Sequence, residues 1–272
     1  AAPDSAVKGR IVYVSQKMQR RRDGGGYGVA VGARAQAAEI GGRKGAVAAL
    51  IRSIGTDSDR FPHTGGGVWF GQIALDPELR KRAITLSDGS LIATTLVPAA
   101  ALSGPDADQL DRLVALGQPV RIKLELDVGY VGEYKGHNVI GDVLGRERPD
   151  EIVLIGGHLD SWDPGTGAID DGAGIAITMA AGAAIAKLPE RPRRTVRVVA
   201  FADEEQGLFG GQAYAKANPD AVLTHVAIAE SDFGAGLSCR FDSTGATDAL
   251  PAVNTSGSVL CPLDIERGGD DA

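Results

Sequence analysis

The stretch EIVLIGGHLD, residues 151–160, leads a run of apolar residues directly into a histidine and an aspartate. A short continuous apolar run of this kind is typical of a strand that is buried on both faces. Near-continuous apolar runs recur at 196–201 and at 222–229, and each of these runs is followed by acidic residues. Segments with helical character, 172–187 and 208–217, separate the runs. The alternation predicts an α/β fold, with a mixed sheet sandwiched between helices.

The chain before about residue 130 is organised differently. Its apolar segments are shorter, and one of them, 120–127, alternates apolar with charged residues as a half-buried strand does. We expect strands at 10–14, 46–51 and 120–127, and helices at 29–40 and 105–117. The change in pattern predicts a β-rich accessory domain in residues 1–130 and an α/β catalytic domain in residues 131–272.

Composition excludes several classes of protein. The net charge of −7 leaves no basic surplus for binding nucleic acid. The uncharged stretch 172–186 is too short to cross a bilayer, and the N-terminus lacks a signal-peptide pattern, so we expect no membrane segment. Cys239 and Cys261 have no metal-binding spacing. They are either free thiols or a disulfide, and the sequence leaves both open.

Acidic residues collect where the expected strands end. The carboxyl ends of parallel strands meet at one edge of a sheet. The side chains concerned are His158, Asp160, Asp170, Asp171, Asp203, Glu204, Glu205, Glu230 and Asp232. Buried carboxylates repel one another unless a cation neutralises them, and histidine with carboxylate ligands suits zinc. The carboxylates are too many for one four-coordinate ion, so we expect two metals and a hydrolytic reaction.

Each of these features also has an ordinary structural explanation. Asp170 and Asp171 could simply be acidic residues at a helix N-terminus. Glu204 and Glu205 could form a solvated turn, and His158 could be a hydrogen-bonded core histidine. Their joint occurrence at three successive strand ends favours the metal site.

Four motifs together resemble those of the co-catalytic dizinc exopeptidases. They are GHLDSWD at 157–163, GAIDDG at 167–172, ADEEQG at 202–207 and ESD at 230–232. The similarity is to the plasma glutamate carboxypeptidase-like (carboxypeptidase Q-like) group within the leucyl aminopeptidase family. Residues 45–55 and 62–65 resemble the protease-associated domain that is inserted in this family.

The resemblance implies a role for each site residue. The implied metal ligands are His158, Asp170, Glu205 and Asp232. His158 and Asp232 would bind one zinc, Glu205 the other, and Asp170 both. Glu204 would be the general base, and the Asp160 carboxylate would fix the tautomer of His158. The Asp170–Asp171 peptide bond is expected to be cis.

The implied function is that of a dizinc metallo-exopeptidase, an aminopeptidase or dipeptidase. It would hydrolyse terminal peptide bonds of short peptides through a metal-bound water, and we expect a secreted or periplasmic protein, with a homodimer possible. The alternatives are a non-catalytic receptor-like binding protein on the same scaffold and a single-metal deacylase. The family completes its site with a histidine well downstream of the position of Asp232. His63, His137 and His225 are poor substitutes, so we expect a catalytic domain incomplete at its C-terminus and a weakly active or inactive chain.

Overall fold

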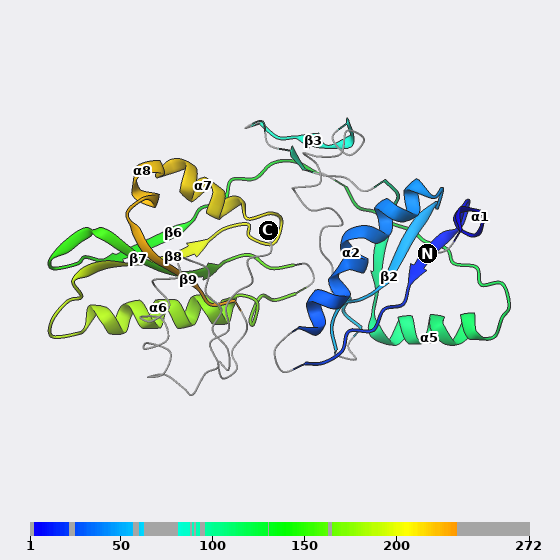
Figure 1. Cartoon of the computed structure of the whole chain (residues 1–272), viewed down its shortest axis with the longest axis horizontal. Helices are drawn as coiled ribbons and strands as arrows, with labels where there is room; N and C mark the ends of the chain where they lie inside the picture. The colour runs from blue at the N-terminus through cyan, green and yellow to red at the C-terminus, as the bar shows by residue number, and fades with distance from the viewer. Residues whose placement is uncertain are drawn as a thin grey trace.

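The computed structural model describes residues 3–21, 25–56, 60–62, 81–87, 89, 91–92, 96–129, 131–162 and 165–232. His63, Cys239 and Cys261 lie outside these residues. Within them the chain forms two α/β units, each built on its own sheet (Figure 1).

The first unit is built on a parallel sheet with strand order β1-β2-β5. Its elements are α1 (Asp4–Val7), β1 (Ile11–Val14), α2 (Gly26–Arg43), β2 (Ala48–Arg52), β5 (Ala99–Leu102) and α5 (Gly104–Ala115), with a small antiparallel pair of β3 (Ile84–Thr85) and β4 (Leu91–Ile92). Alanines of α2 pack on Ala49 and Ile51 of β2. Helices α2 and α5 lie where helices were predicted, at 29–40 and 105–117, and β1 and β2 lie where strands were predicted, at 10–14 and 46–51. The described residues of this unit form an α/β arrangement, not the expected β-rich one.

A buried arginine ties the central strand of the first unit to α5. Arg52, at the end of β2, is 7% exposed and donates to the carboxylates of Asp108 and Asp111, both at 2.7 Å. It also donates to the carbonyl oxygen of Gly104. The N-terminus of α5 is closed by the Ser103 hydroxyl, which accepts from the N–H of Asp106.

The expected strand at 120–127 is not formed, and this prediction was wrong. No strand lies between α5 and the next unit, although residues 116–129 are all described. Val120 and Ile122 remain more than one-third exposed. Alternation of apolar and charged residues can mark one face of a strand, but a strand forms only where another strand pairs with it, and none pairs with this segment.

The second unit is a mixed sheet with strand order β6-β8-β7-β9. Its elements are β6 (Val139–Val143), β7 (Arg148–His158), α6 (Gly172–Ala186), β8 (Arg194–Phe201), α7 (Phe209–Ala217), α8 (Pro219–Val222) and β9 (His225–Glu230). Strands β7, β8 and β9 are parallel and β6 runs antiparallel to β8. The predicted α/β architecture is confirmed.

Helices cover both faces of this sheet, α6 on one side and α7 with α8 on the other (Figure 1). Tyr214 of α7 packs with Ile152, Leu154 and Val199. On the opposite face α6 lies close to β8, since a Cβ at Gly182 would come within 2.5 Å of Val198. Among the described residues, no helix has the length and apolar character needed to cross a membrane.

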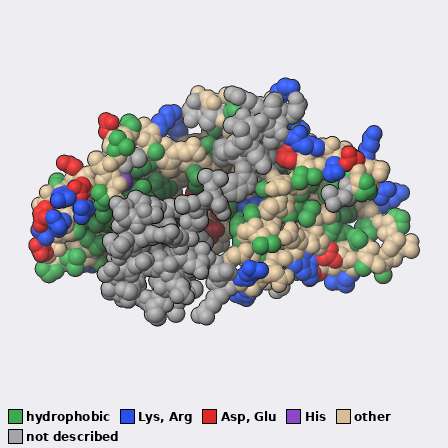
Figure 2. Space-filling view, viewed as in Figure 1, with side chains coloured by type: hydrophobic (Ala, Val, Ile, Leu, Met, Phe, Trp, Pro, Cys, Tyr) green, Lys and Arg blue, Asp and Glu red, His purple; other side chains and the backbone are tan. Residues whose placement is uncertain are grey.

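The two central strands begin in a group of ion pairs. Glu147 pairs with Arg193, and Glu151 pairs with both Arg148 and Arg194. Figure 2 shows acidic and basic side chains mixed at this outer end of the sheet. The opposite end of the same strands carries His158 and the acidic residues.

Candidate metal centre

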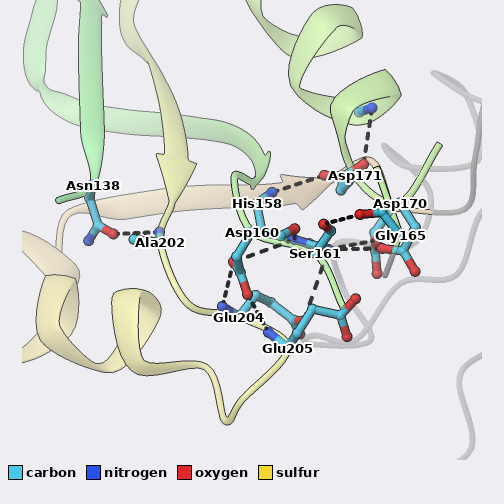
Figure 3. Close-up of polar contacts among 12 residues, drawn as sticks. Asn138, His158, Asp160, Ser161, Gly165, Asp170, Asp171, Ala202, Glu204 and Glu205 are labelled. Carbon is cyan, nitrogen blue, oxygen red and sulfur yellow. Dashed lines mark hydrogen bonds and ion pairs between the residues drawn. The ribbon is translucent and has the colours of Figure 1, made fainter. Parts of the chain in front are cut away.

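The candidate site lies at the carboxyl edge of the second sheet. His158 is the last residue of β7, Glu204 and Glu205 follow β8, and Asp232 follows β9. Asp170 comes from the loop before α6. Figure 3 shows the labelled side chains of His158, Asp170, Glu204 and Glu205 gathered in one place. The parallel strands produce this gathering, because parallel strands end at the same edge.

His158 is the centre of the cluster and is only 1% exposed. Its Nε2 lies 3.0 Å from Oδ1 of Asp170, 3.4 Å from Oδ1 of Asp232 and 4.0 Å from Oε2 of Glu204. Burial by itself disfavours the charged ring, but the negative charges of Asp232 and Glu204 outweigh burial, and the pKa of His158 is raised.

The other ring nitrogen of His158, Nδ1, already has a hydrogen-bond partner. Nδ1 of His158 lies 2.9 Å from the carbonyl oxygen of Asp160, which fixes the tautomer with Nε2 free of its proton in the neutral ring. The Asp160 carboxylate is farther away, with Oδ1 at 3.7 Å from Nδ1. The contact expected from that carboxylate is therefore made by the backbone of the same residue. The carboxylate instead accepts the N–H groups of Glu204 and Glu205.

Asp170 and Asp171 have opposite environments. Asp170 is 61% exposed and its carboxylate faces Nε2 of His158. Asp171 is 1% exposed, and its carboxylate accepts the N–H of His158 at 2.9 Å and the N–H of Gly174 at 3.0 Å. Asp171 is thus the N-cap of α6. The expected cis peptide bond between the two aspartates is present.

The carboxylates at this edge carry more negative charge than the positively charged groups near them in the described structure can neutralise. Burial, with the charge of Asp170 next, raises the pKa of Asp232 to about 7. Burial is also the largest cause of the raised pKa values of Glu204, Glu205 and Glu230. The positive charge that opposes these shifts comes from His158. A cation placed among these groups would stabilise their ionised forms.

The donor set fits such a cation. Two groups of three side chains have ligand atoms within 4.8 Å of one another: His158, Asp171 and Asp232, and His158, Asp170 and Glu205. Because only Nε2 of His158 is available, the ring can bind one ion only. The Asp171 oxygens already accept two backbone N–H groups. Asp170 faces Nε2 of His158, and its carboxylate belongs to the group that also contains Glu205.

The remaining histidines in the described structure stand apart from the cluster. His137 is exposed, and Nε2 of His225 lies 2.9 Å from the Tyr214 hydroxyl. They are structural or exposed, as the sequence indicated.

Two residues that support the site were not singled out from the sequence. Asn138 accepts the N–H of Ala202 and donates to the carbonyl of Gly210, and so holds the two ends of the turn after β8. The side chain of Trp162 hydrogen-bonds Glu205, which partly offsets the effect of burial on its pKa. Trp162 lies inside the motif GHLDSWD, which was a usable signal, whereas Asn138 belongs to no motif.

Comparisons with known proteins agree with this geometry. Residues 138–252 match the sequence model of peptidase family M28. Carboxypeptidase Q of Mus musculus is 30% identical over 263 residues, which cover 97% of this chain and 50% of that protein. The chain spans about half the length of the curated relatives it matches. The expected resemblance to the exopeptidases is confirmed.

Solved structures extend the comparison to the fold. The crystal structure of a peptidase M28 precursor from Shewanella amazonensis is 43% identical, with a TM-score of 0.82, over 100% of this chain and 57% of that one. The zinc aminopeptidase BSAP from Bacillus subtilis is 15% identical, with a TM-score of 0.61, over 97% of this chain and 56% of that one. At that identity, the second likeness shows a shared fold alone.

Proposed function

Because the chain carries a peptidase family M28 region, we propose that it forms the active site of a zinc metallo-exopeptidase that hydrolyses terminal bonds of short peptides. One observation carries the proposal. Nε2 of the buried His158 faces the carboxylates of Asp170 and Asp232. A carboxylate oxygen of Glu205 lies within 4.8 Å of the ligand atoms of His158 and Asp170. The name of the relative carboxypeptidase Q supports release of a terminal residue.

The residues present would hold two zinc ions. His158 and Asp232 would be ligands of one ion, Glu205 would be a ligand of the other, and Asp170 would be shared between them. Zinc, when bound, polarises a scissile carbonyl and lowers the pKa of water. The neutral ring of His158 presents its lone pair at Nε2 because Nδ1–H donates to the carbonyl of Asp160.

Glu204 is the general base in this proposal. Its Oε2 lies 4.0 Å from Nε2 of His158, on the side of the ring where the metal would bind. Burial raises its pKa toward the range in which a carboxylate can both accept and return a proton. The Glu204 carboxylate would take a proton from the attacking water and deliver it to the leaving amine.

The first unit is the accessory domain in this proposal. The connection between the units runs from the end of α5 at Ala115 to the start of β6 at Val139, and a boundary near residue 130 would fall within it. We assign residues 1–130 to a protease-associated domain and 131–272 to the catalytic domain. A secreted or periplasmic location and a homodimer belong to the same proposal.

The test combines metal content with turnover. Zinc per chain is measured by elemental analysis, and hydrolysis is followed with dipeptides and aminoacyl p-nitroanilides. In the full-length enzyme, Glu204→Gln should abolish turnover and keep the zinc content, while Glu190→Gln, at an exposed site beyond α6, should change neither. One zinc per chain would support a single-metal hydrolase. Absence of zinc binding would support a non-catalytic binding protein.

A further inference from the structure

The turn after β8 depends on a residue from the loop that follows the neighbouring strand, β7. Asp203 adopts a positive φ of 55°, and the next two residues are Glu204 and Glu205. Their backbone N–H groups both donate to the carboxylate of Asp160, Glu204 to Oδ1 at 2.8 Å and Glu205 to Oδ2 at 3.0 Å. Each oxygen of Asp160 therefore holds one peptide group (Figure 3).

This arrangement suits an anion. Successive backbone N–H groups beside a left-handed residue form a concave nest of partial positive charge. A carboxylate that fills the nest with both oxygens fixes the position of the two peptide planes and their rotation. Since each Cα–Cβ bond is fixed by its peptide planes, the directions of the Glu204 and Glu205 side chains follow from the position of Asp160.

Asp160 lies on the wrong side of the imidazole to bind the same metal as His158. Its carbonyl oxygen and its Oδ1 are near Nδ1, at 2.9 and 3.7 Å, whereas the metal-binding edge of the ring is Nε2. The Asp160 carboxylate thus remains available for the turn. A nearby backbone bond, from the N–H of Leu159 to the carbonyl of Phe201 at 2.7 Å, joins the same two strand ends.

We propose that the Asp160 carboxylate is a positioning residue for the adjacent glutamates, which it orients through their backbone N–H groups. The loop after β7 then performs two tasks. It places the imidazole through His158, and it sets the general base and one metal ligand through Asp160. The inference rests on the proposed function for the roles of Glu204 and Glu205, but the contact itself does not depend on peptidase activity.

The test uses the whole chain and the variants Asp160→Asn and Asp142→Asn. In Asp160→Asn an amide NH₂ replaces one acceptor oxygen. Asp142→Asn is the matched control, because that carboxylate pairs with Arg197 between β6 and β8, away from the site. The first readout is amide hydrogen exchange in the metal-free protein. We expect exchange at Glu204 and Glu205 to be at least tenfold faster in Asp160→Asn, with Leu159 and the control variant unchanged.

The second readout is the affinity for Co²⁺, measured by competition with a chelator. Loss of an interaction that orients a metal ligand typically lowers affinity about 10–100-fold, and we expect a change of at least about tenfold in Asp160→Asn and none in Asp142→Asn. Weaker Co²⁺ binding with unchanged exchange at Glu204 and Glu205 would overturn the proposal, because Asp160 would then act on the imidazole. Faster exchange with unchanged affinity would overturn it as well.

The unsubstituted protein gives an independent reading should Asp160→Asn fail to fold. Its Glu204 and Glu205 amides should exchange as slowly as strand amides, and exchange at the rate of open loops would overturn the inference. Absence of Co²⁺ binding by the unsubstituted protein would contradict the proposed function, and it is separate from the exchange result.

Discussion

The carboxylate of Asp171 accepts a hydrogen bond from the backbone N–H of His158, 2.9 Å away. The N-cap residue of α6 thereby also fixes the backbone of the histidine at the centre of the candidate metal site. The capping of a helix and the placing of a ligand depend here on one buried side chain.

Asp171→Ala should therefore destabilise the fold. It removes an N-cap, a loss that costs about 1 kcal/mol, and leaves the N–H of His158 buried without a partner, at about 1–3 kcal/mol. The free energy of unfolding, from urea titration, should fall by about 2–4 kcal/mol in total. Asp150→Ala, at an exposed position of β7, is the control and should change it little. An equal effect of the two substitutions would contradict the buried role of Asp171.

Adjacent glycines in α7 should respond oppositely to alanine. A Cβ on Gly210 would lie 2.1 Å from the carbonyl oxygen of Ala202, while a Cβ on Gly211 would meet nothing within 4 Å. Gly211→Ala should raise the midpoint of urea unfolding, since alanine favours a helix by about 0.5–1 kcal/mol. Gly210→Ala should lower the midpoint and weaken zinc binding, because the clash displaces the turn that carries the glutamates. A stabilising Gly210→Ala would show that α7 does not approach β8 so closely.

The metal-free protein should lose stability as pH rises through neutrality. The pKa of Asp232 is about 7 in the fold against 3.8 as an ordinary carboxyl, so between these values the folded chain binds more protons than the unfolded chain. His158 acts in the same direction, because its raised pKa gives stability that is present below 6.5 and lost above the folded value. Thermal midpoints in a chelator should fall from about pH 5 to about pH 8.

Zinc should reverse this trend by stabilising the ionised carboxylates, so the gain in thermal midpoint on adding zinc should be larger at about pH 8 than at about pH 6. Asp232→Asn should flatten the profile of the metal-free protein. A metal-free midpoint that is constant or rises over this range would show that the cluster is compensated by a positive charge of the chain.

Arg52→Ala should weaken the first unit and leave the metal site intact. The guanidinium is buried, but Asp108 and Asp111 are 43% and 33% exposed, so solvent screens the pairs. We expect a loss of about 1–3 kcal/mol in the unfolding of the first unit, mainly from hydrogen bonds that Arg52 makes to charged groups. Zinc affinity should not change. Arg146→Ala, at the outer end of the second sheet, is the control, and a loss of zinc affinity in Arg52→Ala would contradict the division into two units.

The sequence was most informative where burial is two-sided. The run at 152–155 is apolar and the run at 196–201 is apolar except for Arg197, because helices cover both faces of the sheet, so their strands were readable. The segment 120–127 failed because pairing, unlike alternation, depends on a partner elsewhere in the fold. The short helix α8 had no signal strong enough to separate it from the start of β9.

Within the site, the residue types could be predicted from the sequence, but the role of each of two neighbouring residues could not. Asp170 and Asp171 are chemically identical, and only the backbone at the start of α6 decides that one is exposed to the metal side and the other is buried as a cap. Likewise, the tautomer of His158 is set by the carbonyl of Asp160 and not by its carboxylate. A sequence motif specifies that an aspartate is present. It does not specify whether the backbone carbonyl oxygen or a carboxylate oxygen of that aspartate accepts the hydrogen bond.

Strands β7 and β8 begin near arginines and end near the carboxylates of the candidate site. This separation of charge affects the rate at which a metal ion binds. The eleven residues of β7 separate the two groups by roughly 35 Å at about 3.3 Å per residue. The Debye length at physiological ionic strength is about 8 Å, so the arginines cannot oppose the field of the acidic end. That field should attract divalent cations before any contact forms. The association rate constant for zinc should therefore fall as salt rises, while the dissociation rate constant changes little.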